Sequence, residues 1–253
     1  PDSTNLHSKQ FNITAVKEGI EFPEANNTTA YVHFEPYKDV MNIYKKQNEF
    51  GFYDGSAKFD GDIELRPTGL TGDGIMKLAN AEVSSNFFVY NAVFFNADTA
   101  DLVVNADNIG GVAFQSKNLR TYIDLDDKIG MFYSNGAESY VQLPENQYIC
   151  YIDKLKWDMQ QQLLELGETS TTTSGTEFVS THPKQDSLSF VAKTANYSLK
   201  DYVIHAGGVE KIEVADATVF PDSGKVVVEK KAKIRTLENA MVKANNLTEY
   251  HTF

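Results

Sequence analysis

Residues 211–220 read KIEVADATVF and residues 233–242 read KIRTLENAMV, so the C-terminal region contains one sequence pattern twice. Each copy begins with Lys-Ile, runs through polar residues to an alanine, and places an apolar residue two positions after that alanine. The two alanines, Ala217 and Ala240, are 23 residues apart. The interval between them also contains the valine run 226–228, which favours a β-strand. The recurring pattern therefore predicts a repeat of short strands and turns.

The same spacing occurs elsewhere in the chain. Ala195 lies 22 residues before Ala217, and Ala57 and Ala81 are 24 residues apart. A period of this length, with two strands in each repeat, is typical of one rung of a β-solenoid. Because rungs stack ~4.8 Å apart, one inward position recurs directly above itself. We therefore expect these alanines to occupy the same narrow inward corner of successive rungs.

Outside the repeat, the chain is dense in short runs of β-forming residues and poor in helical patterns. Turn signals such as Asp54-Gly55 and Asn135-Gly136 separate the runs. One segment, 158–166, fits either an amphipathic helix or a strand. The sequence thus predicts an all-β protein, a β-solenoid or other stack of short-strand repeats, with a β-sandwich as the alternative. The runs are 30–34, 87–90, 93–95, 102–104, 122–125, 148–152 and 225–228.

A polar run divides the chain into two parts. Residues 168–177 read ETSTTTSGTE, a composition typical of an exposed loop. We therefore expect a β-rich N-terminal part (1–167), a polar loop (168–178) and a C-terminal β-repeat part (179–253). The alternative is that these parts form one continuous domain.

Composition and charge argue against several classes of protein. The 253 residues carry a formal net charge of −12, and 42% of them are hydrophobic. Disordered chains are less hydrophobic, and a polyphosphate partner would meet net repulsion, so we expect no nucleic-acid partner. The chain has a single cysteine, Cys150, which cannot form an intrachain disulfide. Cys150 lies in a strand-like run and is predicted to be a small buried hydrophobe rather than a nucleophile.

No motif in the sequence specifies a catalytic or cofactor site. The glycines of 68–74 (TGLTGDG) lack the Lys-Ser/Thr that ends a phosphate loop, so we interpret them as a connection between two strands. Residues 60–64 begin like a calcium loop, but Leu65 stands at the position where that loop requires glycine. Ser180, His182 and Asp186 are neighbours without a nucleophile-elbow motif. We therefore predict no catalytic, cofactor-binding or metal-binding residues and no cofactor.

Aromatic residues are the one enriched class, with 16 Phe and 13 Tyr against one Trp. Tyr140, Tyr148 and Tyr151 lie close to Trp157 in the sequence, and a surface ladder of tyrosines could stack on sugar rings. Core and cross-strand packing is the simpler interpretation, because sheets favour aromatic pairs.

Two long stretches resemble segments of large uncharacterised secreted or envelope proteins of Bacteroidetes. They are residues 180–253 (STHPKQDSLSF to EYHTF) and residues 55–90 (GSAKFDGDIELRPTGLTGDGIMKLANAEVSSNFFVY). More faintly, the run of extended repeats is similar to the OstA-type and AsmA-type β-rich proteins of the Gram-negative envelope. The first resemblance rests on these two stretches and brings no catalytic signature. It implies an extracytoplasmic setting (periplasm, outer membrane or secreted) and a structural, transport or adhesive role.

Together these features predict a non-catalytic structural or binding segment of a larger bacterial envelope or secreted protein. Two alternatives stay open: a carbohydrate-binding or polysaccharide-cleaving β-solenoid, and a conduit for lipid or glycolipid. The expected partners are the rest of the parent protein or envelope components, with a glycan or a lipid in the alternatives. Because the repeat restarts at Ala240, we also expect the parent to continue beyond Phe253 and the chain to self-associate end to end.

Overall fold

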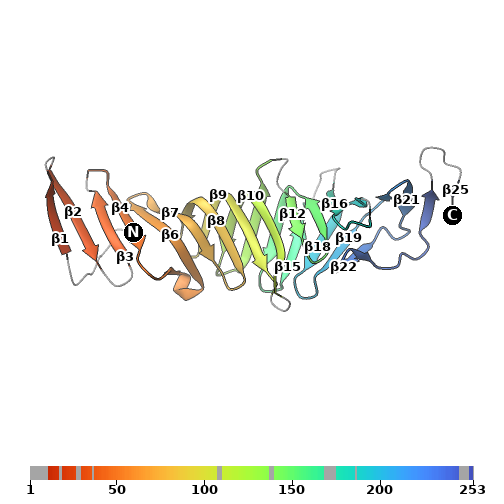
Figure 1. Ribbon diagram of the computed structural model, residues 1–253, viewed down its shortest axis with the longest axis horizontal. Coiled ribbons are helices and arrows are strands. Elements are labelled where there is room, and N and C mark those ends of the chain that lie inside the picture. Colours follow the sequence, from red (N-terminus) through yellow and green to blue (C-terminus); the bar gives the residue numbers. More distant parts are fainter. Residues whose placement is uncertain are drawn as a thin grey trace.

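The computed structural model describes residues 11–16, 19–26, 30–35, 37–106, 110–136, 140–167, 175–185, 187–244 and 251–252. Within these ranges the chain forms 25 strands and one short 3-10 helix, η1. The strands lie across the long axis of an elongated molecule, with β1 at one end and β25 at the other (Figure 1). The prediction of an all-β protein built from stacked strands is therefore confirmed. The elements are β1 (Phe11–Val16), β2 (Gly19–Asn26), β3 (Ala30–Glu35), β4 (Val40–Lys45), β5 (Phe50–Phe52), η1 (Tyr53–Gly55), β6 (Ala57–Arg66), β7 (Gly69–Lys77), β8 (Ala81–Tyr90), β9 (Phe94–Asn105), β10 (Val112–Asp124), β11 (Ile129–Ser134), β12 (Tyr140–Leu143), β13 (Tyr148–Tyr151), β14 (Lys154–Asp158), β15 (Leu163–Leu166), β16 (Thr176–Ser180), β17 (Ser189–Ala192), β18 (Thr194–Ser198), β19 (Val203–Gly207), β20 (Ile212–Val214), β21 (Ala217–Phe220), β22 (Val226–Glu229), β23 (Lys233–Ile234), β24 (Met241–Ala244) and β25 (His251–Thr252).

The five long strands β6 to β10 bend at their middles. In β8, Ala81 and Val83 are buried near the start and Phe88 and Tyr90 near the end, while the residues between them are partly or fully exposed. Side chains of a straight strand alternate strictly between its faces. Here the buried positions change from odd to even numbers, and the pairing of β8 with β7 shifts register at the same place. The sheet therefore folds over itself, and its two halves face each other as two layers.

The two layers, named A and B, become separate sets of strands after β10. Residues 119–124 of β10 pair with β11, whereas Gln115 and Ser116 pair with β12. Layer A continues through β11, β14, β15, β18, β19, β22 and β23. Layer B continues through β12, β13, β16, β17, β20, β21, β24 and β25. The chain thus supplies one antiparallel hairpin to each layer in turn.

These pairings connect the two sides of the polar run at 168–178. β13 pairs with β16 and β15 pairs with β18, so both sides contribute to the same two layers. Of the expected loop, residues 168–174 lie outside the described residues, and β16 begins at Thr176. The ambiguous segment 158–166 forms the last residue of β14, a turn and strand β15, which confirms its strand alternative.

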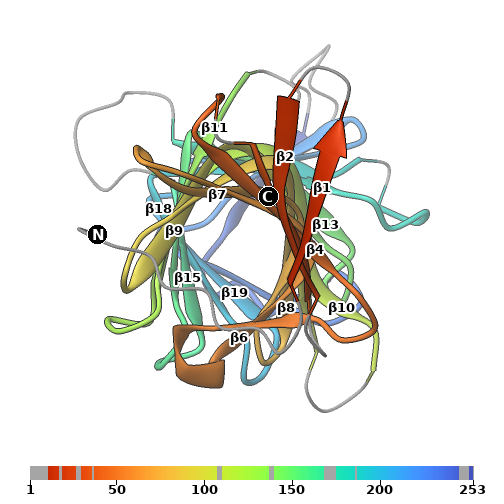
Figure 2. The same ribbon diagram turned by 90° about the vertical axis from the view of Figure 1, so that its left-hand side faces the viewer.

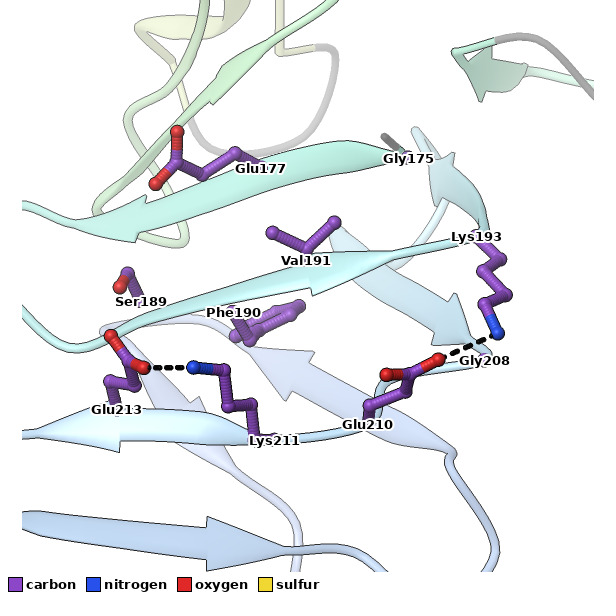
Figure 3. Close-up of a pocket in the computed structure, with 10 residues that line it drawn as sticks. All are labelled: Gly175, Glu177, Ser189, Phe190, Val191, Lys193, Gly208, Glu210, Lys211 and Glu213. Atoms are coloured by element: carbon purple, nitrogen blue, oxygen red, sulfur yellow. Dashed lines mark hydrogen bonds and ion pairs between the residues drawn. The ribbon is translucent and has the colours of Figure 1, made fainter. Parts of the chain in front are cut away.

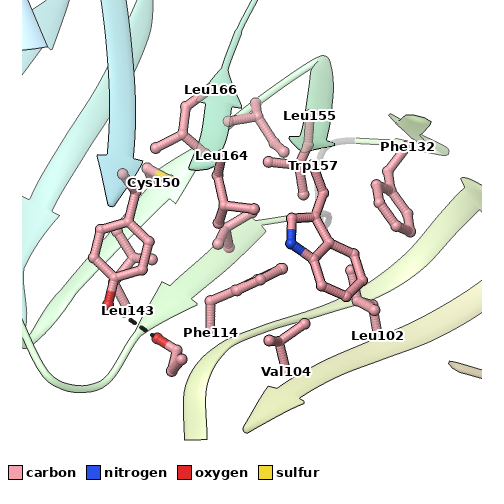
Figure 4. Close-up of a cluster of buried hydrophobic side chains, with 14 of the residues drawn as sticks. Leu102, Val104, Phe114, Phe132, Leu143, Cys150, Leu155, Trp157, Leu164 and Leu166 are labelled. Atoms are coloured by element: carbon pink, nitrogen blue, oxygen red, sulfur yellow. Dashed lines mark hydrogen bonds between the residues drawn. The ribbon is translucent and has the colours of Figure 1, made fainter. Parts of the chain in front are cut away.

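The core lies between the two layers and extends along the molecule from Ala57 to Ala232. Aromatic rings bridge the layers: Phe59 meets Phe88 with ring centroids 6.0 Å apart, and Phe114 meets Trp157 at 6.3 Å. The second pair lies among leucines of both layers (Figure 4). Viewed along the long axis, the strands surround a common centre (Figure 2). Burying one phenylalanine side chain contributes ~1.5–3 kcal/mol to the stability of the fold, so burial of these side chains is the main interaction that holds the layers together.

Glycines allow the backbones of β6 and β7 to approach closely at the bend. Gly61 and Gly74 are paired in register. A Cβ on Gly61 would lie 2.1 Å from the Asp73 carbonyl oxygen, and a Cβ on Gly74 would lie 2.3 Å from that of Asp60. The stretch 68–74 therefore belongs mostly to strand β7, and its interpretation as a connection between strands was wrong. Glycine is required there because two backbones meet, rather than because the chain turns.

The recurring alanines do not share one corner. Ala195 lies in β18 of layer A, whereas Ala217 lies in β21 of layer B, where it pairs with Ala244. Ala195 is buried, but Ala217 and Ala240 are only half-buried. The predicted stack of alanines is therefore wrong. The reason is that the chain alternates between antiparallel hairpins of two layers, so residues about one period apart can fall in different layers, as Ala195 and Ala217 do.

Polar residues, instead of alanines, recur where the chain crosses from one layer to the other. The Nδ2 of Asn135 donates to the Asp98 carbonyl oxygen at 2.6 Å, and its backbone N–H donates to the Asn118 carbonyl oxygen at 3.4 Å. The Ser85 hydroxyl donates to the Thr99 carbonyl oxygen at 2.7 Å. These bonds join the crossing points of neighbouring strands and satisfy backbone groups that the bend removes from the sheet ladder.

The opposite edges of the layers meet at a second set of bonds, the Asn146 junction. Asn146 lies in the turn between β12 and β13 of layer B and is fully buried. Its Nδ2 donates to the carbonyl oxygens of Tyr202 at 2.8 Å and Val228 at 3.1 Å, both in layer A. The backbone N–H of Ala232 donates to the Asn146 carbonyl oxygen at 2.9 Å. One turn of layer B is thereby joined to two hairpins of layer A.

Candidate functional site

The outer face of layer B carries few charges between β10 and β17. Its outward residues form two rows that follow the register across neighbouring strands. Glu177 is the only carboxylate in these rows. We name this surface the B face: Tyr140, Tyr151, Glu177 and Val191 in one row, and Gln115, Gln142, Ile149, Val179 and Ser189 in the other.

The outer face of layer A is charged by comparison. Lys156 and Glu165 form an ion pair at 2.9 Å. The Arg120 guanidinium lies 4.9 Å from the centroid of the Tyr133 ring, and the Lys154 ammonium lies 5.7 Å from it. Such solvated ion pairs and cation–π contacts are ordinary features of an exposed sheet face. The B face is therefore the better candidate for a binding surface.

Two tyrosines stand exposed on the B face. The Tyr140 residue is 37% exposed and Tyr151 is 41% exposed, and their ring centroids are 6.1 Å apart on neighbouring strands. The Gln115 Nε2 donates to the Gln142 Oε1, and the Gln142 Nε2 donates to the Tyr140 hydroxyl at 3.4 Å. The amides thus hold one another and the phenol in place while remaining partly accessible.

A groove follows the B face at the edge of β17. The ladder between β17 and β20 contains only the pairs Ser189–Glu213 and Phe190–Ile212. Beyond them residues 208–211 leave the sheet, and an open groove of about 300 Å³ lies between the two segments. Figure 3 shows its walls. The lining residues are Gly175, Glu177, Ser189, Phe190, Val191, Lys193, Gly208, Glu210, Lys211 and Glu213.

The charges of the groove are paired except for Glu177. Lys193 contacts Glu210 at 2.8 Å, and Lys211 contacts Glu213 at 2.5 Å. The hydrogen bond from Lys193 lowers the pKa of Glu210. Among the described residues Glu177 has neither an ion pair nor a side-chain hydrogen bond, and its carboxylate points away from both ion pairs (Figure 3). Glu177 is thus an available acceptor between Tyr151 and the groove.

The aromatic cluster anticipated from the sequence is divided by the sheet. Tyr148 and Trp157 are buried, at 1% and 2% exposure, and burial raises the pKa of Tyr148 to about 12. Tyr140 and Tyr151 are on the outer face. The sequence indicates this division, because Tyr148 and Tyr151 are three residues apart in one strand and must therefore face opposite sides of the sheet. Glu177 and the groove carried no signal, because they depend on pairing between distant strands.

The acidic residues weighed for calcium are engaged in other contacts. Asp60 is ion-paired with Lys45 and lies 3.6 Å from Lys77, and the Lys45 hydrogen bond lowers its pKa. Burial, together with the neighbouring carboxylate of Asp73, raises the pKa of Asp62. Within the described ranges no group of three or more His, Cys, Asp or Glu side chains is arranged to hold a metal ion.

The Ser-His-Asp neighbours form a turn. The Ser180 hydroxyl accepts the backbone N–H of His182 at 3.2 Å, and the His182 Nδ1 accepts the backbone N–H of Lys184 at 3.1 Å. Asp186 lies outside the described residues. Cys150 is fully buried in β13 beneath the B face, which confirms the prediction of a buried hydrophobe.

Comparison of the chain with protein-family models, with curated proteins and with solved structures finds no match. In the part of the chain that the structure describes, no helix has the length and hydropathy needed to cross a membrane.

Proposed function

We propose that the chain is an elongated, non-catalytic structural segment of a larger bacterial envelope or secreted protein. The observation that supports this proposal is the continuous core between layers A and B, which extends from Ala57 to Ala232. Each hairpin contacts mainly its neighbours along the stack, as in repeat proteins whose length is set by the number of units. Such a molecule holds its two ends apart and presents long lateral faces to partners.

The proposed setting and partners follow from the resemblance described for residues 55–90 and 180–253. It points to an extracytoplasmic location, where the rest of the parent protein or other envelope components would be the partners. End-to-end self-association remains part of the proposal, because an outermost strand presents unpaired N–H and C=O groups to another strand.

Of the two alternative functions, one is favoured by a specific observation. A lipid conduit needs an open apolar channel, whereas large rings such as Phe59 and Trp157 occupy the interior and are at most 2% exposed. The exposed tyrosines and the groove of the B face instead favour a carbohydrate-binding role on the outside of the molecule. That role is compatible with a structural segment, because it uses only the surface.

Small-angle X-ray scattering and sedimentation velocity on the purified chain test the structural role. We expect an extended particle whose maximum dimension along the stack far exceeds its cross-section. A globular scattering profile from a folded, β-rich sample would contradict the proposal.

Two further measurements address the alternatives. Incubation with plant and host polysaccharides is expected to release no reducing ends, and released ends would identify a polysaccharide-cleaving enzyme. Native mass spectrometry is expected to give the mass of the polypeptide alone. A co-purified lipid at constant stoichiometry would support the conduit in place of the structural segment.

A further inference from the structure

We propose that the B face binds a neutral polysaccharide chain, with the rings of Tyr140 and Tyr151 as its platform and the Glu177 carboxylate as an acceptor for sugar hydroxyls. This site adds to the structural role proposed above and does not depend on it. The occupant is inferred from three properties of the face: its exposed rings, its planar polar groups and its charge.

The exposed rings match the apolar faces of sugars. A pyranose ring presents C–H groups that pack against an aromatic face, and tyrosine offers a large, rigid contact area with a polar tip. Tyr140 and Tyr151 project from neighbouring strands, which are spaced ~4.8 Å apart. A polysaccharide lying across the strands would therefore meet the two rings in succession and then reach Glu177 and Val191, the next residues of the same row.

The planar polar groups match sugar hydroxyls. Gln142 is held by Gln115 on one side and by the Tyr140 hydroxyl on the other, so its amide is oriented before any ligand arrives. Such preorganisation lowers the entropic cost of binding. Glu177 adds an acceptor without a partner among the described residues, and charge-assisted hydrogen bonds from hydroxyl groups to a carboxylate are stronger than neutral ones.

The charges of the face select a neutral ligand. The two lysines of the groove are already paired with Glu210 and Glu213, which leaves Glu177 in excess. The whole chain carries a net charge of −12, so an anionic glycan would be repelled. An acyl chain is also a poor occupant, because it would cover Glu177 and the two glutamines without offering them hydrogen bonds.

Affinity electrophoresis of the full chain through gels containing laminarin, xylan, glucomannan or polygalacturonate tests the proposal. We expect retardation by at least one of the three neutral polysaccharides and none by polygalacturonate. Titration calorimetry with the retarding polysaccharide should then show a loss of about tenfold or more in affinity for Tyr151→Ala, since aromatic contacts of this kind contribute at that level. Glu177→Gln should weaken binding, and Tyr151→Phe should retain it.

Tyr122 provides the matched control. It is 36% exposed on the outer face of layer A, close to the exposure of Tyr140, and its ring packs against Phe94. Tyr122→Ala should leave affinity unchanged. The proposal is overturned if no neutral polysaccharide retards the folded chain, if Tyr122→Ala weakens binding as much as Tyr151→Ala, or if polygalacturonate binds more tightly. None of these results alters the scattering profile that tests the structural role, so the two proposals fail separately.

Discussion

The amide of Asn146 joins the two layers at the edge opposite their bends. Its Nδ2 supplies hydrogen atoms to two carbonyl oxygens, whereas its Oδ1 is buried without a partner among the described residues. Because the residues it joins are 56 and 82 positions away, these bonds close long loops of the chain. Only a donor can satisfy two facing carbonyl groups, and the Asn146 Nδ2 does so with its two hydrogen atoms.

Asn146→Ala should therefore lower the free energy of unfolding by ~1–3 kcal/mol, because the carbonyl groups of Tyr202 and Val228 lose their donor in the interior. Asn146→Asp should cost more at neutral pH, since a buried carboxylate would face two carbonyl oxygens. Burial raises the pKa of such an acid above that of the unfolded chain, so the variant should regain stability as the pH falls. Urea unfolding followed by circular dichroism measures both effects.

The matched control for these variants is Asn48→Ala in an exposed turn, which should change the free energy of unfolding by less than ~0.5 kcal/mol. Equal losses for Asn48→Ala and Asn146→Ala would show that the Asn146 junction contributes nothing specific.

Cys150 makes a second prediction at the scale of one residue. It is fully buried in the folded chain, and burial raises the pKa of its thiol. In the unfolded chain the thiol ionises near its ordinary value of ~8.5. Because the pKa of the thiol is higher in the folded chain than in the unfolded chain, its contribution to stability is fully present at pH values below the unfolded-state pKa. That contribution is lost as the pH rises above the unfolded-state pKa, by at most ~1.4 kcal/mol for each pH unit.

The unfolding free energy of the native chain should therefore fall faster between pH 8 and pH 10 than that of Cys150→Ala. Comparing the two slopes removes the contribution of the tyrosines, which both proteins share. A thiol reagent should label Cys150 only after denaturant is added. Parallel slopes together with rapid labelling of the folded chain would show that the thiol is accessible.

At the scale of strands, sequence reasoning found the elements but not their geometry. Runs such as 102–104 and 148–152 were predicted as strands and lie within β9 and around β13. In the sequence, the bend of β8 appears only as a change in the alternation of apolar residues between Val83 and Phe88. A search for short independent strands assigns the residues on either side of that change to two separate strands. The direction of pairing is not encoded in a period of apolar residues, since parallel rungs and antiparallel hairpins both produce one. That ambiguity led to the wrong prediction for Ala217.

The bend itself can be tested at Gly61 and Gly74. Alanine at either position should destabilise the protein by roughly 1–3 kcal/mol or more, because the added Cβ meets a backbone carbonyl oxygen that cannot move independently. Gly51→Ala in β5 is the control, since a Cβ there meets nothing within 4 Å. Thermal unfolding of the three variants gives the comparison. If Gly61→Ala and Gly51→Ala melt together, the backbones of β6 and β7 are not in close contact at the bend.

At the scale of the whole molecule, we expect local unfolding of separate regions rather than a single cooperative transition. Strands β9 and β10 span both layers and share the most extensive pairing, whereas β3 and β4 pair within layer A only. In a linear stack, local stability follows contacts with neighbouring units. Amide hydrogen exchange should therefore be slowest in β9 and β10 and markedly faster in β3 and β4. Uniform protection across all these strands would indicate a single cooperative unit instead.

The alternation of hairpins between layers A and B has a consequence for how such a molecule can change in evolution. Duplication of two successive hairpins lengthens both layers equally, preserves the inward and outward faces of every strand and leaves the cross-section unaltered. Duplication of one hairpin lengthens only one layer and leaves its apolar side uncovered. Selection should therefore accept gains and losses in even numbers of hairpins, and relatives of different length should differ by whole pairs.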